Sequence, residues 1–172
     1  MNTQILRWMG STSLYTFVQV DLDAPCYSQP LHVEDLPQLT ATNPILVSDD
    51  DLNLLTLIQT VLEHEIPLRT IGTLDSRETL RLSTEIPVSL IISDVMKPGI
   101  DGFEILRRVR ANPETCDLPY MFVTARSDRA SIERGQALGV DRYMVKPFFP
   151  HELISTVRQL LLERYRKVMI CQ

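Results

Sequence analysis

The stretch LIISDVMKPGIDGFEILRRVR at residues 90–110 decides the fold of this 172-residue chain. It begins with a continuous run of Leu and β-branched residues, which is typical of a central strand that is buried on both faces. The run ends at Asp94, a loop continues to Asp101, and apolar residues then recur at helical spacing from Phe103 onward. A buried strand, an acidic strand end and an amphipathic helix together indicate one unit of a parallel α/β sheet.

The same unit repeats before and after this stretch. Strands are predicted near residues 45–47, 68–71, 88–92, 120–123 and 143–145, and a segment of helical periodicity follows each of them. Capping residues mark the predicted helix boundaries, with acids or Ser at the starts and a glycine at one end: Asp51, Asp75 or Ser76, Asp128 and Gly139. Short right-handed crossovers place helices on both faces, so the predicted fold class is α/β with a doubly wound, five-stranded parallel sheet.

Three segments are expected along the chain. Residues 43–165 form the predicted domain, residues 1–42 an N-terminal arm and linker, and residues 166–172 a C-terminal tail. Residues 14–22 of the arm alternate in polarity with period two, which favours a strand or hairpin. Three interpretations of the arm stay open: a loosely packed tail, a strand added to a sheet edge or a partner, and a start site assigned too far upstream.

Composition excludes several classes of protein. The net charge of −5 argues against a nucleic-acid-binding body, and no apolar run reaches the ~20 residues that span a bilayer. The three cysteines are far apart and form no CxxC pair, so they are expected to be free thiols in a reducing cytosol. We therefore expect a cytoplasmic protein without nucleic-acid or membrane partners.

Polar residues follow four of the predicted strands: Asp49 and Asp50, then Asp94, Thr124 and Lys146. Ligand sites of open parallel sheets form outside the carboxyl ends of the strands, so we expect these side chains to meet. Clustered carboxylates repel one another unless a cation shares the site, and Mg²⁺ prefers oxygen ligands. A phosphoryl group on Asp94 would place its charged oxygens against the cation, the ammonium and the hydroxyl.

Four strings carry a resemblance to a known family. ILVSDDD at residues 45–51, the stretch at residues 90–110, MFVTAR at 121–126 and RYMVKPF at 142–148 resemble the receiver domains of two-component response regulators. The resemblance implies a flavodoxin-like receiver fold with strand order 2-1-3-4-5. It also implies that the chain accepts a phosphoryl group on Asp94 in signal transduction.

The resemblance assigns a role to each residue of the site. Asp94 would be the phosphoacceptor, Asp50 would bind Mg²⁺ or Mn²⁺ directly, and Asp49 would assist through water. Asp94 itself and the backbone carbonyl of Met96 would complete the metal ligands.

The remaining assigned roles concern the response to the phosphoryl group. Lys146 would pair with Asp94 or its phosphate, across a cis bond to Pro147. Thr124 and Tyr143 would be the switch pair that responds to phosphorylation.

The resemblance also predicts partners. None of the three histidines lies near the predicted strand ends, so the phosphodonor is expected to be a histidine kinase or phosphotransfer protein. Output is expected through protein contacts on the face of the fourth helix, fifth strand and fifth helix of the domain, around Arg129, Tyr143 and Arg158. That face could bind a downstream target or form a homodimer.

Two departures from the family pattern matter. Ser48 and Ser93 stand at strand ends where apolar residues are usual. Met96 flanks the site and cannot position a water well, so slow self-dephosphorylation is expected. The protein is otherwise not expected to be an enzyme.

Two alternatives compete with phosphoryl-dependent signalling. The spacing of Asp49 and Asp51, with Thr124 and Lys146, resembles haloacid-dehalogenase-type phosphohydrolases, in which Asp49 would be the nucleophile. Asn53 and the lack of paired acids after Lys146 speak against it. A phosphorylation-independent scaffold or binding module is the second alternative, although such modules generally lack one of the acids or the lysine.

Overall fold

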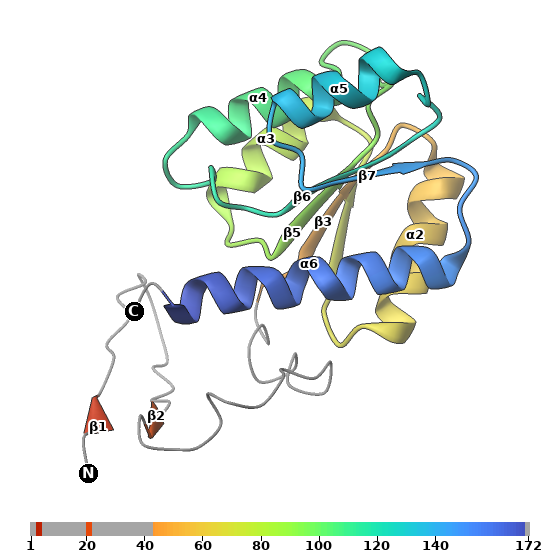
Figure 1. Ribbon diagram of the computed structural model, residues 1–172. Coiled ribbons are helices and arrows are strands. Elements are labelled where there is room, and N and C mark those ends of the chain that lie inside the picture. Colours follow the sequence, from red (N-terminus) through yellow and green to blue (C-terminus); the bar gives the residue numbers. More distant parts are fainter. Residues whose placement is uncertain (1–2, 5–19, 22–42, 171–172) are drawn as a thin grey trace. The chain divides into compact units, whose positions relative to one another are not determined.

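The structure of the protein is a computed structural model that describes residues 3–4, 20–21 and 43–170 (Figure 1). The chain divides into two units, residues 1–31 and residues 32–172. In the first unit the described residues form two short antiparallel strands, β1 (Thr3–Gln4) and β2 (Val20–Asp21). The predicted strand at residues 14–22 is described only in its β2 part. Its remainder and the predicted linker lie outside the described residues.

The second unit contains five strand–helix repeats. Its elements are β3 (Ile45–Ser48), α2 (Leu52–Glu65), β4 (Thr70–Thr73), α3 (Ser76–Glu85), β5 (Leu90–Ser93), α4 (Gly102–Ala111), β6 (Tyr120–Thr124), α5 (Arg129–Ala137), β7 (Arg142–Val145) and α6 (Pro150–Ile170). The strands pair in parallel in the order β4-β3-β5-β6-β7. Numbered within this unit, that is the predicted order 2-1-3-4-5, and the predicted fold class is confirmed.

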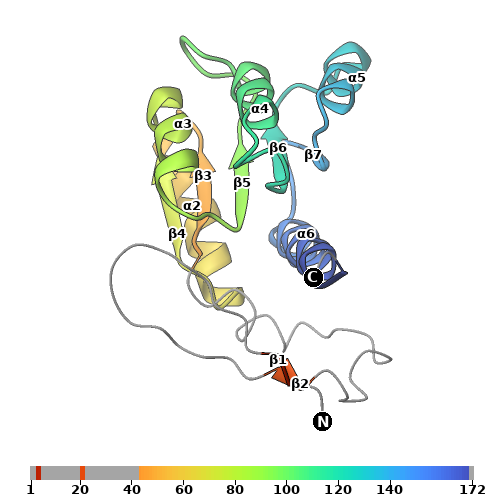
Figure 2. The same ribbon diagram turned by 90° about the vertical axis from the view of Figure 1, so that its left-hand side faces the viewer.

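Helices cover both faces of this sheet. Helices α2 and α6 lie on one face, and α3, α4 and α5 lie on the other (Figures 1 and 2). Side chains of β3 alternate between the two cores: Ile45 packs with residues of α2 and α6, whereas Leu46 packs with residues of α4. Strand β5 is buried along its whole length, which is why its sequence is apolar at successive positions.

Aspartates begin four of the helices. The side chains of Asp51, Asp75, Asp101 and Asp128 accept backbone N–H bonds in the first turns of α2, α3, α4 and α5. The caps predicted at Asp51, Asp75 and Asp128 are thereby confirmed, and Gly139 has the predicted positive φ, at 82°. Each cap satisfies N–H groups that the helix itself leaves without a partner.

The last helix is longer than its sequence suggested. Helix α6 continues to Ile170, through residues that were predicted to be a tail after Tyr165. No glycine or proline ends the helix there, and Arg164 anchors it by donating to the carbonyls of Val88 and Ser89 at 2.7 and 2.6 Å. Within the described ranges no helix, α6 included, has the length and apolar character needed to cross a membrane.

Arg110 ties three segments of the second unit together. Its guanidinium donates to the carboxylate of Asp141 at 2.8 Å and to the carbonyls of Gly139 and Leu118 at 3.0 and 2.7 Å. The same carboxylate oxygen of Asp141 accepts the amide of Tyr120 at 2.8 Å. Helix α4, the start of β6 and the turn before β7 therefore share one charged, partly buried network.

Replacing Arg110 with alanine should lower the free energy of unfolding by about 2–4 kcal/mol, because Asp141 and three backbone carbonyls lose a charged partner. Arg107 is the matched control, since its 58% exposed side chain pairs with Glu104 on the same helix. Arg107→Ala should cost less than about 1 kcal/mol. Urea unfolding measures the free energy of unfolding of both variants, and equal losses would contradict the role of the Arg110 network.

Candidate functional site

Three carboxylates meet at the carboxyl ends of neighbouring strands. Asp49 and Asp50 follow β3, and Asp94 follows β5, whose last residue, Ser93, pairs in register with Ser48. One carboxylate oxygen of each acid lies within 4.8 Å of the others. Asp49 and Asp94 are buried and Asp50 is exposed, so the cluster opens to solvent on one side. The prediction that these acids lie close together is confirmed.

Lys146 reaches the same cluster from one edge of the sheet. It follows β7, two strands away from β5, and its Nζ donates to Asp49 Oδ2 at 2.8 Å and to Asp94 Oδ2 at 2.5 Å. Burial alone would lower the pKa of Lys146, but the bonds to Asp49 and Asp94 raise it above its ordinary value. The peptide bond between Lys146 and Pro147 is cis, as the resemblance implies.

The two buried acids have different surroundings. Burial raises the pKa of Asp49, although Lys146 and the backbone amide of Asp51 oppose that shift. Asp94 Oδ1 accepts the amide of Met96 at 2.8 Å, which fixes the loop after β5 against the carboxylate. Oxygen ligands from three carboxylates suit a small divalent cation such as Mg²⁺ or Mn²⁺, so the residues present fit the implied metal.

Thr124 and Tyr143 both contact the backbone of Arg126. Thr124 ends β6 fully buried, and its Oγ1 accepts the amide of Arg126 at 3.3 Å. Tyr143, on β7, donates its hydroxyl proton to the Arg126 carbonyl at 3.0 Å, while its ring meets the edge of Phe122 at a centroid distance of 5.7 Å. One residue of the loop after β6 therefore links the buried hydroxyl to the partly exposed ring.

Lys97 is a site residue that the sequence reasoning missed. Only 8% of the residue is exposed, and its Nζ donates to Ser48 Oγ at 2.5 Å and to Ser93 Oγ at 3.1 Å. Burial lowers the pKa of Lys97 to about 8, and the nearby carboxylates, Asp94 first, act in the opposite direction. The two serines at adjacent strand ends were visible in the sequence, but only the fold brings the lysine between them.

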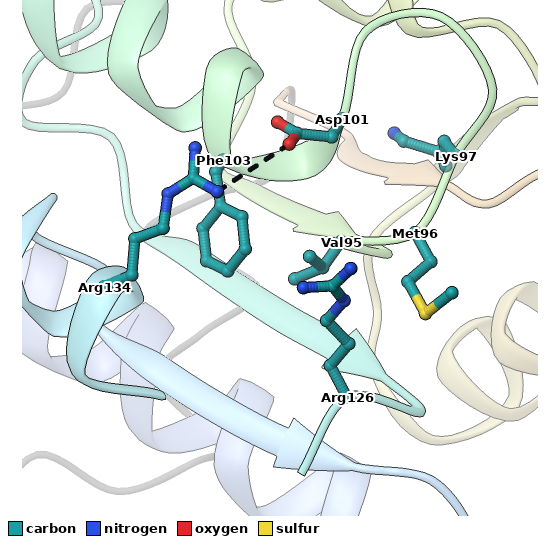
Figure 3. Close-up of a pocket in the computed structure, with 7 residues that line it drawn as sticks. All are labelled: Val95, Met96, Lys97, Asp101, Phe103, Arg126 and Arg134. Atoms are coloured by element: carbon teal, nitrogen blue, oxygen red, sulfur yellow. Dashed lines mark ion pairs between the residues drawn. The ribbon is translucent and has the colours of Figure 1, made fainter. Parts of the chain in front are cut away.

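A cavity of about 380 Å³ lies beside the loop after β5 (Figure 3). The guanidinium of Arg134, on α5, lies 4.3 Å above the ring of Phe103 and 4.0 Å from the carboxylate of Asp101. Arg126 borders the cavity from the loop after β6, so two arginines lie at its edges. The remaining lining residues are Val95, Met96 and Lys97.

The comparisons with known proteins agree with this geometry. The family model of the response regulator receiver domain matches residues 45–158 of this chain. The phosphate regulon transcriptional regulatory protein PhoB of Rhizobium meliloti is 41% identical over 118 residues, which cover 68% of this chain and 51% of that protein. The response regulator ArlR of Staphylococcus saprophyticus is 36% identical over 73% of this chain and 56% of its own length.

Solved structures share the fold. A putative response regulator from Chloroflexus aurantiacus is similar with a TM-score of 0.64 and 32% identity, covering 69% of this chain and 97% of that one. A CheY-like receiver domain protein from Methanospirillum hungatei has a TM-score of 0.68 at 22% identity, covering 73% and 98%. This chain spans about half the length of the curated relatives it matches, whereas it covers nearly the whole of these two solved chains.

Gly102 allows the backbone of α4 to approach the site closely. A Cβ at this position would lie 2.3 Å from the Asp94 carbonyl oxygen and 2.8 Å from Val95 Cα. Gly102→Ala should therefore lower the free energy of unfolding by about 1–3 kcal/mol and shift the backbone beside the carboxylates. Gly72→Ala is the control, because the atoms nearest to its Cβ belong to the flexible end of Gln59.

Thermal or urea unfolding measures both glycine variants, and amide NMR shifts of residues 94–96 report the displacement. Equal stability of the two variants, with unchanged shifts at Asp94, would contradict the close approach.

Proposed function

The chain belongs to the response regulator receiver domain family, and on this premise we propose that it signals by accepting a phosphoryl group on Asp94. The observation that carries the proposal is the placement of the Asp94 carboxylate. It lies among two other carboxylates at the carboxyl edge of the sheet, with the Lys146 ammonium 2.5 Å from one of its oxygens. A receiver needs this combination of a nucleophilic carboxylate and cationic stabilisation.

The reaction is a transfer of one phosphoryl group between two proteins or from a small phosphodonor. A carboxylate oxygen of Asp94 forms a bond to phosphorus while the bond from phosphorus to the donor nitrogen or oxygen breaks. The electron pair of that bond leaves with the donor, and the product on this chain is an acyl phosphate. Lys146 would hold a phosphoryl oxygen, and the contact of its Nζ with Asp94 supports this role.

Asp49, Asp50 and Asp94, with the backbone carbonyl of Met96, are the proposed ligands of Mg²⁺ or Mn²⁺. When bound, the cation supplies positive charge that offsets the negative charge of the phosphoryl oxygens. The mutual approach of the three carboxylates within 4.8 Å supports this assignment. The Met96 amide, bonded to Asp94, fixes the loop from which that carbonyl would act.

Thr124 and Tyr143 are the proposed switch pair. A phosphoryl group on Asp94 would attract the Thr124 hydroxyl, which now accepts the amide of Arg126. Moving that hydroxyl would disturb the same residue whose carbonyl holds the Tyr143 hydroxyl. The contacts of both residues with Arg126 support a path from the site to the outer face of β7.

The proposed partners follow from this chemistry. The phosphodonor would be a histidine kinase or a phosphotransfer protein, and the output would pass to a protein target on the face of α5, β7 and α6, or to a second copy of this chain. Arg129 and Tyr143 present exposed or partly exposed side chains there, which supports a contact surface. A phosphorylation-independent scaffold remains the competing function, and the experiment below separates the two.

The chain should gain one phosphoryl group when it is incubated with Mg²⁺ and acetyl phosphate, and Asp94→Asn should gain none because an amide is a poor nucleophile. Asp101→Asn is the matched control on the same loop, since asparagine also caps a helix. Intact-mass measurement and peptide mapping follow the modification. A folded wild-type chain that binds Mg²⁺ yet takes no phosphoryl group, from acetyl phosphate or candidate protein donors, would favour the scaffold.

We propose that the phosphorylated chain loses its phosphoryl group slowly, because the apolar Met96 side chain, 52% exposed beside the site, cannot align a water. Met96→Asn should shorten the lifetime of the acyl phosphate by about tenfold, which is less than the roughly 10²–10⁴-fold effect of a general acid or base because asparagine would only position a water. Decay of the phosphorylated mass after removal of the donor measures it. Turnover of the wild-type chain within seconds would contradict slow hydrolysis.

A further inference from the structure

Lys97 is a buried cation that phosphoryl transfer, as described above, does not use. Its Nζ lies between the ends of β3 and β5 and donates to the hydroxyls of Ser48 and Ser93. Both partners are neutral, and Ser48 Oγ in turn shares a hydrogen bond of 2.6 Å with Thr79 Oγ1 of α3. The serines accept two of the three N–H donors of the ammonium but do not cancel its charge.

The positive charge of Lys97 acts on the acidic cluster through space. Asp94, Asp49 and Asp50 are the acids that most favour its charged form, and none of them is a hydrogen-bond partner of Nζ among the contacts of residues 43–167. A charge buried beside the site is screened by water and salt far less than an exposed one. Lys97 therefore influences any ion that enters the cluster, whether cation or anion.

The charges of the site show in which direction this influence works. Three carboxylates, Lys146 and Lys97 give the resting cluster a net charge of −1, instead of −2 if residue 97 were neutral. With Lys97 charged, the resting cluster therefore attracts a divalent cation less strongly than it would with a neutral residue 97. With the cation bound and a phosphoryl dianion on Asp94, the same groups sum to zero, whereas a neutral residue 97 would leave a charge of −1.

We propose that Lys97 is a charge-setting residue of the receiver site, one that weakens cation binding to the resting site and strengthens binding of the phosphoryl group. This inference rests on the proposed function and names a residue that tunes it. The unusual serines at the strand ends are explained by it, because they are the groups that allow an ammonium to be buried there. A resting chain with Lys97 holds less cation, and a phosphorylated chain holds its phosphoryl group more firmly.

Lys97→Met tests the charge, because methionine has a similar length and no charge. At neutral pH the variant should bind Mg²⁺ about tenfold more tightly than wild type, by titration calorimetry without phosphodonor. At saturating Mg²⁺ it should bind beryllofluoride, a mimic of the phosphoryl group, about tenfold more weakly. Neither measurement depends on phosphoryl transfer.

Two further variants separate charge from packing and from hydrogen bonding. Lys97→Gln keeps a donor for the serines without the charge, so it should behave like Lys97→Met. Arg134→Met removes an exposed cation at the edge of the neighbouring cavity (Figure 3), where solvent screens it, and should change both affinities less than about twofold. Thermal unfolding checks that all three variants are folded, and Lys97→Met should be at least as stable as wild type.

In Lys97→Met the affinities for Mg²⁺ and for beryllofluoride must change in opposite directions, since a loosened loop would weaken the binding of both ligands. Unchanged affinities in Lys97→Met, a weakening of both, or wild-type behaviour of Lys97→Gln would overturn the inference while leaving the proposed function intact. A wild-type chain that binds neither Mg²⁺ nor beryllofluoride would overturn the proposed function itself, and the inference with it.

Discussion

The bridge from Lys146 to Asp49 and Asp94 is the interaction on which the site depends. Parallel strands bring their carboxyl ends to one edge of the sheet, and three acids at that edge repel one another. A single ammonium, 2.8 and 2.5 Å from two of these carboxylates, offsets part of the repulsion. Because it arrives from β7, it also connects the edge strand to the centre of the sheet.

The scaffold holds these groups by burying almost everything around them. Strands β3, β5 and β6 are buried along their whole length, and the helices that follow β3 and β5 begin at capping aspartates. Close packing leaves little freedom for the loop after β5, since Gly102 places the first turn of α4 directly against the Asp94 carbonyl. The geometry of the acids is therefore a property of the core as much as of the loops.

The site is connected to the edge strand β7 and to helix α3. Through Arg126, the buried Thr124 hydroxyl is linked to the Tyr143 ring on the edge strand. Through Lys97 and Ser48, the strand ends are linked to Thr79 on α3. We propose that a change of charge at Asp94 acts on both connections at once, because each contains a polar group that can respond to an anion in the site.

Sequence patterns by themselves determined the fold class and the residues of the acidic cluster, and the resemblance to receiver domains implied the sheet order. Hydrophobic periodicity locates strands and helices, and aspartates at strand ends such as Asp94 are recognisable because parallel strands expose their carboxyl ends together. The end of α6 was predicted five residues too early. No glycine or proline marks the end of this helix in the sequence, and the bond from Arg164 to the Val88 carbonyl that anchors it forms only in the folded chain. The burial of Lys97 was decided only by tertiary structure. A lysine near an acid usually lies in solvent, and only the register of β3 and β5 brings Ser48 and Ser93 together to receive its ammonium.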